Sequence, residues 1–135
     1  METHNFNQLP VYKKALEIFQ VSRGIALSLS EKRHVLEMGY SAAKNDQVAG
    51  ALVSTSLKLF PELAAIQNAT TRENILKRAR RIRKSARQLL AKCKLIEKQG
   101  LKEKEYLRLL IIEINNFDRL FGDWLNTLYL NKNQN

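Results

Sequence analysis

The apolar residues of this chain recur at alternating spacings of three and four, and this repeat sets what the chain can fold into. The clearest run is Ile75, Ala79, Ile82, Ala86, Leu89, Cys93 and Ile96. An α-helix has about 3.6 residues per turn, so this spacing places all seven on one side of a helix as an apolar stripe. Because a single stripe has to pack against others, the repeat indicates a helical bundle.

The same repeat and the helix-boundary residues divide the chain into four helices, predicted for residues 11–27, 31–67, 71–98 and 102–129. Pro10 suits the start of the first helix, and Thr70 with Glu73 forms a capping box before the third. Pro61 lies inside the second helix, where it removes a backbone hydrogen bond. The spacing of three and four continues through Pro61, so the prediction is one helix kinked there, with Asn45 and Ser56 on its stripe.

Four long helices joined by short turns predict an all-α fold, an antiparallel up-down-up-down four-helix bundle that forms one domain over residues 1–135. No alternating Val, Ile and Thr run indicates a strand. The last helix has a second apolar set beside its stripe: Leu109, Ile112, Leu120 and Leu125. This extra apolar width is explained either by contact with another copy of the chain or by a deeper core.

Positive charge is concentrated in the third predicted helix. Residues 72–98 contain eleven basic and two acidic residues, which accounts for nine of the ten net positive charges of the chain. On a helical wheel the basic side chains lie opposite the apolar stripe or beside it. A solvated helix face is the simplest explanation, but arginine-rich rows without interleaved glutamate are typical of a surface for a polyanion.

The predicted nucleic-acid-binding residues are the cations of this face and its two edges. They are Lys77, Arg78, Arg80, Arg81, Arg83, Lys84 and Arg87. Four residues of helix advance about 6 Å, which suits successive backbone phosphates. No aromatic residue interrupts the face, so contacts to phosphate are expected rather than base stacking.

Catalytic and metal-binding patterns are missing from the sequence, and the prediction is a protein that is not an enzyme and holds no cofactor. His4 and His34 lack metal-ligand spacing to a cysteine or to each other. Cys93 falls on an apolar stripe and is expected to be a buried small residue rather than a nucleophile. The glycines are isolated and form no phosphate-binding loop.

The sequence also predicts a cytoplasmic location. The chain shows neither a continuous transmembrane-length apolar run nor the pattern of a signal peptide at its start. Its one cysteine precludes an internal disulfide bond and fits a reducing compartment.

In the lengths and order of its predicted helices, most of the chain resembles a known superfamily of four-helix bundles. This superfamily includes ribosomal RNA intervening-sequence proteins and the accessory variability determinant (Avd) proteins of diversity-generating retroelements. The opening Leu9-Pro-Val-Tyr-Lys-Lys-Ala-Leu-Glu-Ile is similar to the first helix of the superfamily. The arginine-rich third helix, Tyr106, and the ending Leu120-Phe-Gly122-Asp-Trp124-Leu are closer to the Avd branch. Asp123 stands where that branch usually has a second glycine, and Pro61 is not typical of the family.

The resemblance implies a function. Avd proteins are non-enzymatic, basic homopentameric barrels of four-helix-bundle subunits, and they bind a reverse transcriptase and nucleic acid during error-prone copying of template RNA into cDNA. The implied partners are therefore a reverse transcriptase, RNA or cDNA, and further copies of the chain.

Three alternatives stay open at the level of sequence. The chain resembles the intervening-sequence branch as well, a basic bundle helix could instead bind an acidic protein, and a basic helix could lie on anionic lipid. The last alternative requires bulky apolar residues beside the charge, whereas the stripe here is expected to face a core.

Overall fold

The computed structural model describes residues 6–30, 34–40, 43–98 and 104–133, and all regular structure in these ranges is helical. A short 3-10 turn, Phe6–Gln8, precedes the first α-helix. The α-helices are α1 (Pro10–Leu29), α2 (Val35–Tyr40), α3 (Lys44–Leu57), α4 (Leu59–Gln67), α5 (Arg72–Lys98) and α6 (Lys104–Asn133). The predicted all-α class is confirmed for the part of the chain that the structure describes.

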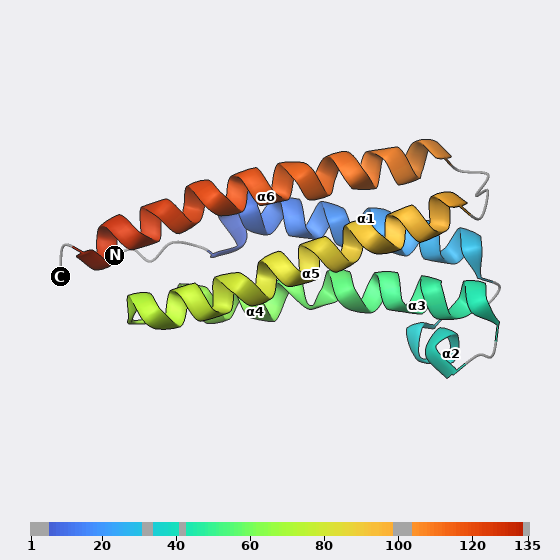
Figure 1. The fold of residues 1–135 in the computed structure, drawn as a ribbon, viewed down its shortest axis with the longest axis horizontal. Coiled ribbons are helices and arrows are strands. Elements are labelled where there is room, and N and C mark those ends of the chain that lie inside the picture. The colour runs from blue at the N-terminus through green and yellow to red at the C-terminus, as the bar shows by residue number, and fades with distance from the viewer. Residues whose placement is uncertain (1–5, 31–33, 41–42, 99–103, 134–135) are drawn as a thin grey trace.

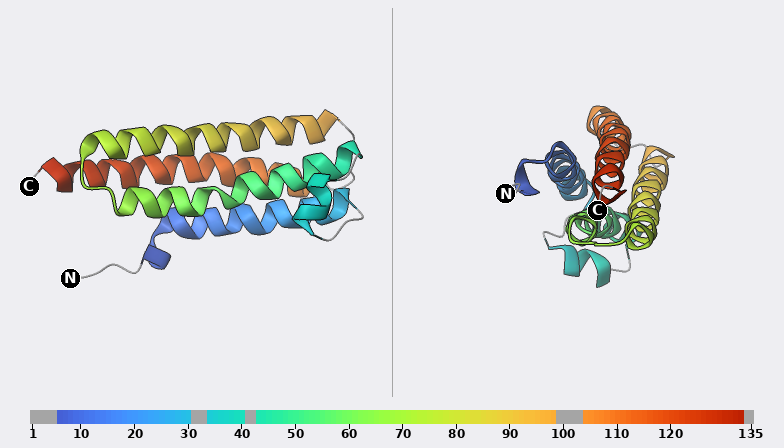
Figure 2. Two further views of the ribbon diagram at one scale, coloured as in Figure 1. Left: turned by 90° about the horizontal axis from the view of Figure 1, so that it is seen from below. Right: turned by 90° about the vertical axis from the view of Figure 1, so that its left-hand side faces the viewer.

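The long helices lie side by side, as Figures 1 and 2 show. Helix α3 continues almost directly into α4, and together they form one rod beside α1 and α5. Helix α6 packs against α1 and α5 and closes the arrangement. The short helix α2 lies across the end of α3, outside the group of long helices (Figure 1).

The apolar stripes of α1 and α5 face the interior as predicted. All seven stripe residues of α5 are buried. In α1 the stripe with the same spacing is buried throughout and consists of Val11, Ala15, Ile18, Ser22 and Ile25. The predicted boundaries hold to within two residues at the ends of these helices, since α1 covers Pro10–Leu29 and α5 covers Arg72–Lys98. The predicted cap of α5 was wrong by one residue, because the Thr71 hydroxyl rather than that of Thr70 accepts the Asn74 N–H, at 3.1 Å.

The prediction of one continuous helix over residues 31–67 was wrong. The described part of this range forms three helices, and residues 31–33 and 41–42 lie outside the described residues. Helix α2 is separate from α3, so a spacing counted from one into the other has no structural basis. Asn45, predicted on the stripe, is exposed, and its neighbour Asp46 is buried instead, where it accepts a hydrogen bond from Ser30.

The interruption near Pro61 falls at Lys58, where α3 ends and α4 begins. A proline clashes with the carbonyl of the residue four positions earlier, and for Pro61 that residue is Leu57, the last of α3. Lys58 itself keeps helical backbone angles, with φ −63° and ψ −21°. The chain therefore continues in nearly the same direction, and the burial of Leu59, Leu63 and Ile66 continues that of Leu52 and Ser56.

One main core unites α1, α3, α4, α5 and α6, with Phe117 and Phe121 among its largest fully buried side chains. Their rings stack at 6.0 Å between centroids. A second, smaller cluster lies where α2 covers α1 and α3, and it contains Met38, Ala26, Ala49 and Val53. Burial of Met38 explains why a helix of only six residues is held in place.

The additional apolar set of the last helix divides between the core and the surface. Leu125 is buried and Leu120 packs against the core, whereas Leu109 and Ile112 are 41% and 54% exposed. The helix itself, α6, begins at Lys104 and continues to Asn133, beyond the predicted end at residue 129; residues 102–103 lie outside the described part. Packing in the core thus accounts for two of the four additional apolar residues, and the other two are left on the surface.

An ion pair joins α1 to α6. Lys14 Nζ lies 2.9 Å from a carboxylate oxygen of Glu113 and 2.7 Å from one of Glu17. The Glu113 side chain is only 12% exposed, so the ammonium group compensates a carboxylate that has lost most of its water. Hydrogen bonds to Glu17 and to Glu113 raise the pKa of Lys14 above its ordinary value.

Candidate nucleic-acid interface

The candidate interface is carried by α5, which is the longest basic element and is fixed along its length by its apolar stripe. The Thr71 cap begins the helix, and the buried residues from Ile75 to Ile96 hold it against α3, α4 and α6. A helix of 27 residues is about 40 Å long. Its basic side chains are therefore attached to a rigid rod rather than to a disordered arm.

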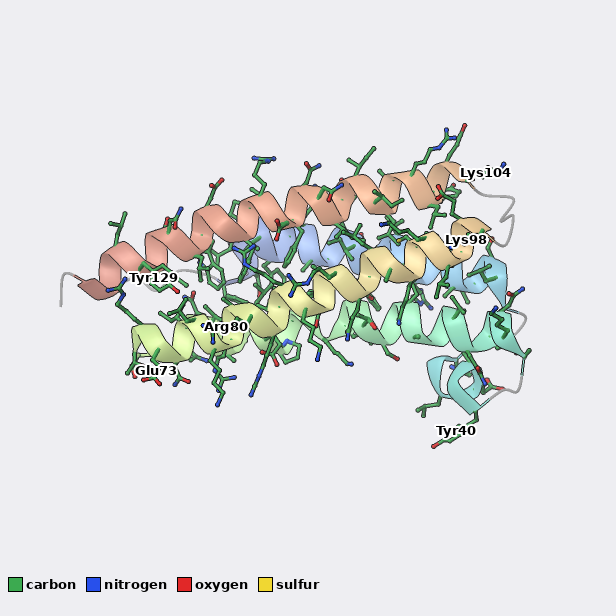
Figure 3. The ribbon with its side chains drawn as sticks, viewed as in Figure 1. Tyr40, Glu73, Arg80, Lys98, Lys104 and Tyr129 are labelled. Atoms are coloured by element: carbon green, nitrogen blue, oxygen red, sulfur yellow. The ribbon has the colours of Figure 1, made fainter. Side chains whose placement is uncertain are left out.

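The outward side of α5 carries five cations that we call the cationic face: Lys77, Arg80, Arg81, Lys84 and Arg87. All five are exposed, and none forms an ion pair with another residue that the structure describes. Arg80, which Figure 3 labels, belongs to this face and lies nearer the Glu73 end of α5 than the Lys98 end. The guanidinium and ammonium groups are thus free to bind a ligand with negative charge.

The two predicted edge residues differ from the face. Arg78 is half-buried, and a helical wheel places it on the flank of α5 away from Arg83. Arg83 is half-buried on the opposite side, where its Nη1 donates to Asp118 Oδ1 of α6 at 3.0 Å. The Arg83 guanidinium also lies 5.3 Å from the centroid of the Phe121 ring. Arg83 therefore already has partners inside the protein, unlike the five residues of the cationic face.

Acidic residues lie at the ends of the cationic helix and along one edge. Glu73 and Glu97 stand near the first and last turns of α5, outside the range of the face (Figure 3 labels Glu73). Asp118 is the carboxylate that approaches α5 from α6. Between Lys77 and Arg87, which are separated by about 15 Å of helix rise, α5 itself contains no acidic residue.

A cleft with a volume of about 240 Å³ lies between α5 and α6, beside the cationic face. Arg83 and Arg87 line it from α5, Asn115 and Asp118 line it from α6, and its apolar lining is Ala86, Leu90 and Ile114. Arg87 belongs to both the cleft and the face. The sequence analysis missed Asn115 and Asp118, because helical spacing does not show which flank of α5 faces α6.

The cysteine and histidine residues, which are the candidates for catalysis or metal binding, form no common site among the residues that the structure describes. Cys93 is fully buried, and burial, with a smaller contribution from Glu97, raises the pKa of its thiol to about 12. His34 is exposed next to α2, while His4 lies outside the described residues. Within residues 6–30, 34–40, 43–98 and 104–133, no three His, Cys, Asp or Glu side chains come together as metal ligands would.

One segment is apolar enough to be compared with a membrane span. The 24 residues Lys44–Gln67 include a window with a mean hydropathy of 1.2. Half of this window is buried against the rest of the protein, as expected for a helix that packs in a core. Its composition is therefore explained by its position between α1 and α5.

The fold and this surface together define an all-helical protein with a cationic helix face that has no ion-pair partner among the residues described here. Comparison of the chain with protein-family models, curated proteins and solved structures finds no match.

Proposed function

We propose that this chain is a non-enzymatic protein that binds RNA through the cationic face of α5. The observation that carries the proposal is the row of five exposed cations on a rigid helix without carboxylate partners among the described residues. Like charges at this spacing repel one another by about 0.2–0.5 kcal/mol per pair, so the arrangement is costly unless a polyanion is bound. Three of the five are arginines, whose planar guanidinium groups suit bidentate contact with phosphate.

Binding of this kind depends mainly on the phosphate backbone. Arg80, Lys84 and Arg87 form one row along α5, and neighbouring members are separated by about 4.5–6 Å of helix rise. Each phosphate that the face neutralises adds roughly 0.7–0.9 to the slope of log affinity against log salt. Weak sequence preference along the face and strong salt dependence follow, because phosphates are the same at every nucleotide.

The cellular role that we propose follows from the resemblance to Avd proteins. In this role the chain is a cytoplasmic accessory subunit of a diversity-generating retroelement, which binds the reverse transcriptase and the template RNA or cDNA. Each subunit would be an antiparallel up-down-up-down four-helix bundle within a homopentameric barrel. The exposed Leu109 and Ile112 on α6 support self-association, since burial between copies would remove them from water.

The test of RNA binding uses two variants with equal loss of charge. The four-glutamine variant replaces Arg80, Arg81, Lys84 and Arg87. The dispersed variant replaces Lys13, Arg23, Arg108 and Arg119, which are exposed and lie on α1 and α6. Fluorescence anisotropy with a structured RNA, over a series of salt concentrations, should show a large loss of affinity for the four-glutamine variant alone. Its salt slope should fall by about 3, from four lost contacts at roughly 0.7–0.9 each.

Equal losses in the two variants would mean that only net charge matters, and unchanged affinity in the four-glutamine variant would exclude the face as the RNA site. Circular dichroism should show the same helix content for both variants and the parent protein. A partner that is an acidic protein rather than RNA would appear as tighter, face-dependent binding to that protein at the same salt concentration.

A genomic test addresses the retroelement role separately. A reverse transcriptase gene with a template and variable repeat pair beside this gene would support it. Insertion of the gene within ribosomal RNA genes would instead support the intervening-sequence branch.

A further inference from the structure

We infer that the cleft between α5 and α6 is a binding site for one guanine base of single-stranded RNA. This inference rests on the proposed function and deepens it, because it adds recognition of a base to recognition of phosphates. The cleft, which is lined by Arg83, Arg87, Asn115 and Asp118 above an apolar floor, is continuous with the cationic face through Arg87.

The cleft has the two kinds of surface that a nucleobase requires. Leu90 and Ile114 provide apolar area for the flat face of a ring. The polar groups stand at the rim, where they reach the hydrogen-bonding edge. With a volume of about 240 Å³, the cleft is smaller than the range of about 300–1,000 Å³ that is usual for larger ligands, which suits a single base.

Two polar groups of the rim, those of Arg83 and Asp118, are already held in place before any ligand arrives. The Arg83 guanidinium is held by Asp118 at 3.0 Å and by the Phe121 ring at 5.3 Å. Only Oδ1 of Asp118 accepts from Arg83, and the other carboxylate oxygen receives no hydrogen bond from a residue that the structure describes. A ligand therefore meets a fixed guanidinium donor beside a free carboxylate acceptor.

Asp118 decides the chemical class of the ligand. A carboxylate beside a phosphate-binding face weakens the attraction for phosphate, and Asp118 also neutralises Arg83, so the cleft attracts phosphate less than the cationic face does. A carboxylate accepts hydrogen bonds from N–H groups, and guanine offers two adjacent ones, N1–H and N2–H, next to the O6 acceptor. Guanine can thus donate to Asp118 and accept from Arg83 or Asn115, whereas adenine and uracil lack the paired donors.

The position of Arg87 links the base to the strand. Arg87 is exposed on the cationic face and also lines the mouth of the cleft. A nucleotide whose phosphate is bound by Arg87 can turn its base into the cleft only if that base is unpaired, because a paired guanine uses N1–H and N2–H in the duplex. The predicted ligand is accordingly a guanine in a single strand or loop.

The test compares two short unstructured RNAs that differ only in having guanine or adenine at the same positions. The protein should bind the guanine RNA roughly fivefold more tightly or better, as for a bidentate base contact. The variant Asp118→Asn should lose this preference while it still binds both RNAs through the cationic face. The control is Asp123→Asn, which changes the charge equally on an exposed α6 residue outside the cleft and should keep the preference.

Each result has one meaning. Equal binding of the two RNAs by the parent protein, or a preference that survives in Asp118→Asn, overturns the guanine site and leaves the cationic face intact. Loss of the preference in Asp123→Asn also overturns it, since charge alone would then explain the effect. If neither RNA binds at low salt, the proposed function fails together with the guanine site.

Discussion

The four-glutamine variant should be more stable than the parent protein at low ionic strength, although it loses four charged groups. The reason is the spacing of the cations. Between Lys77 and Arg87, the substitutions remove three like-charge pairs at i, i+4 and five at i, i+3. At the low end of about 0.2 kcal/mol per pair, which suits exposed groups, the gain in free energy of unfolding is about 1.5 kcal/mol.

Glutamine is a suitable replacement because its helix propensity is close to that of arginine and lysine, so the backbone contributes almost nothing to the difference. None of the four substituted side chains has an ion pair to lose within the described residues. The cations that the dispersed variant removes are far less crowded, because only Arg108 has a like-charged neighbour one turn away, Lys104. This variant should be at most slightly more stable than the parent. Comparison of the two isolates the repulsion within α5 from a general effect of net charge.

Urea denaturation followed by circular dichroism measures both variants, first at low salt and then near 1 M salt. The screening length shortens to about 3 Å at 1 M, so the gain of the four-glutamine variant should nearly disappear there. A four-glutamine variant that is less stable than the parent at low salt would refute the reasoning. It would show that the cations are paired or packed in the folded protein rather than mutually repelling.

Three further predictions concern the interior. Lys14→Met should lower the free energy of unfolding by about 1–3 kcal/mol at neutral pH, because the carboxylate of Glu113 loses its cation. The double variant Lys14→Met with Glu113→Leu should recover most of this lost free energy, because no unpaired charge is left behind. The pKa of Lys14 is raised in the folded protein, so Lys14 contributes its full stabilisation below pH 10.5, the ordinary pKa of lysine. This stabilisation is lost as the pH rises through the pKa of Lys14 in the folded protein. Denaturation at several pH values measures the loss. Cys93 should resist a disulfide reagent at pH 8 until the protein unfolds. Ser22→Ala should leave the free energy of unfolding unchanged or raise it by about 1 kcal/mol, because the buried Ser22 hydroxyl has no partner among the described residues. Ser56→Ala should lower the free energy of unfolding, because the Ser56 hydroxyl donates to Val53 O at 2.7 Å. Thermal unfolding of both variants measures the difference.

The sequence predicted those parts of the fold that depend on helical spacing within one unbroken helix. The stripe of α5 from Ile75 to Ile96 is buried without exception, because seven apolar residues on one side of a helix have a single low-energy placement. The same reasoning was wrong for residues 31–67. The helix ends within that range, and Asp46 rather than Asn45 turns inward beside Ser30.

The sequence predicted the exposed cationic face but not its surroundings. Lys77, Arg80 and Lys84 are exposed because the opposite side of their helix is buried. The pairing of Arg83 with Asp118 depends on which neighbour lies on each flank of α5, and a helical wheel contains no information about that order. The cleft and its carboxylate therefore required the three-dimensional arrangement.

The packing of α5 explains how the protein maintains a face whose charges repel. Ile75, Ile82, Leu89 and Ile96 are fully buried, and each contributes about 1.5–3 kcal/mol to folding. Together they contribute about 6–12 kcal/mol, several times the repulsion of about 1.5 kcal/mol. The same repulsion couples folding to binding. A polyanion on the cationic face removes this repulsion, and the ordered array of cations exists only in the folded protein. RNA should therefore bind the folded protein more tightly and raise the stability of the whole bundle by mass action. If the cations serve only solubility, RNA should leave the stability of the protein unchanged, because no ligand then relieves the repulsion between the cations.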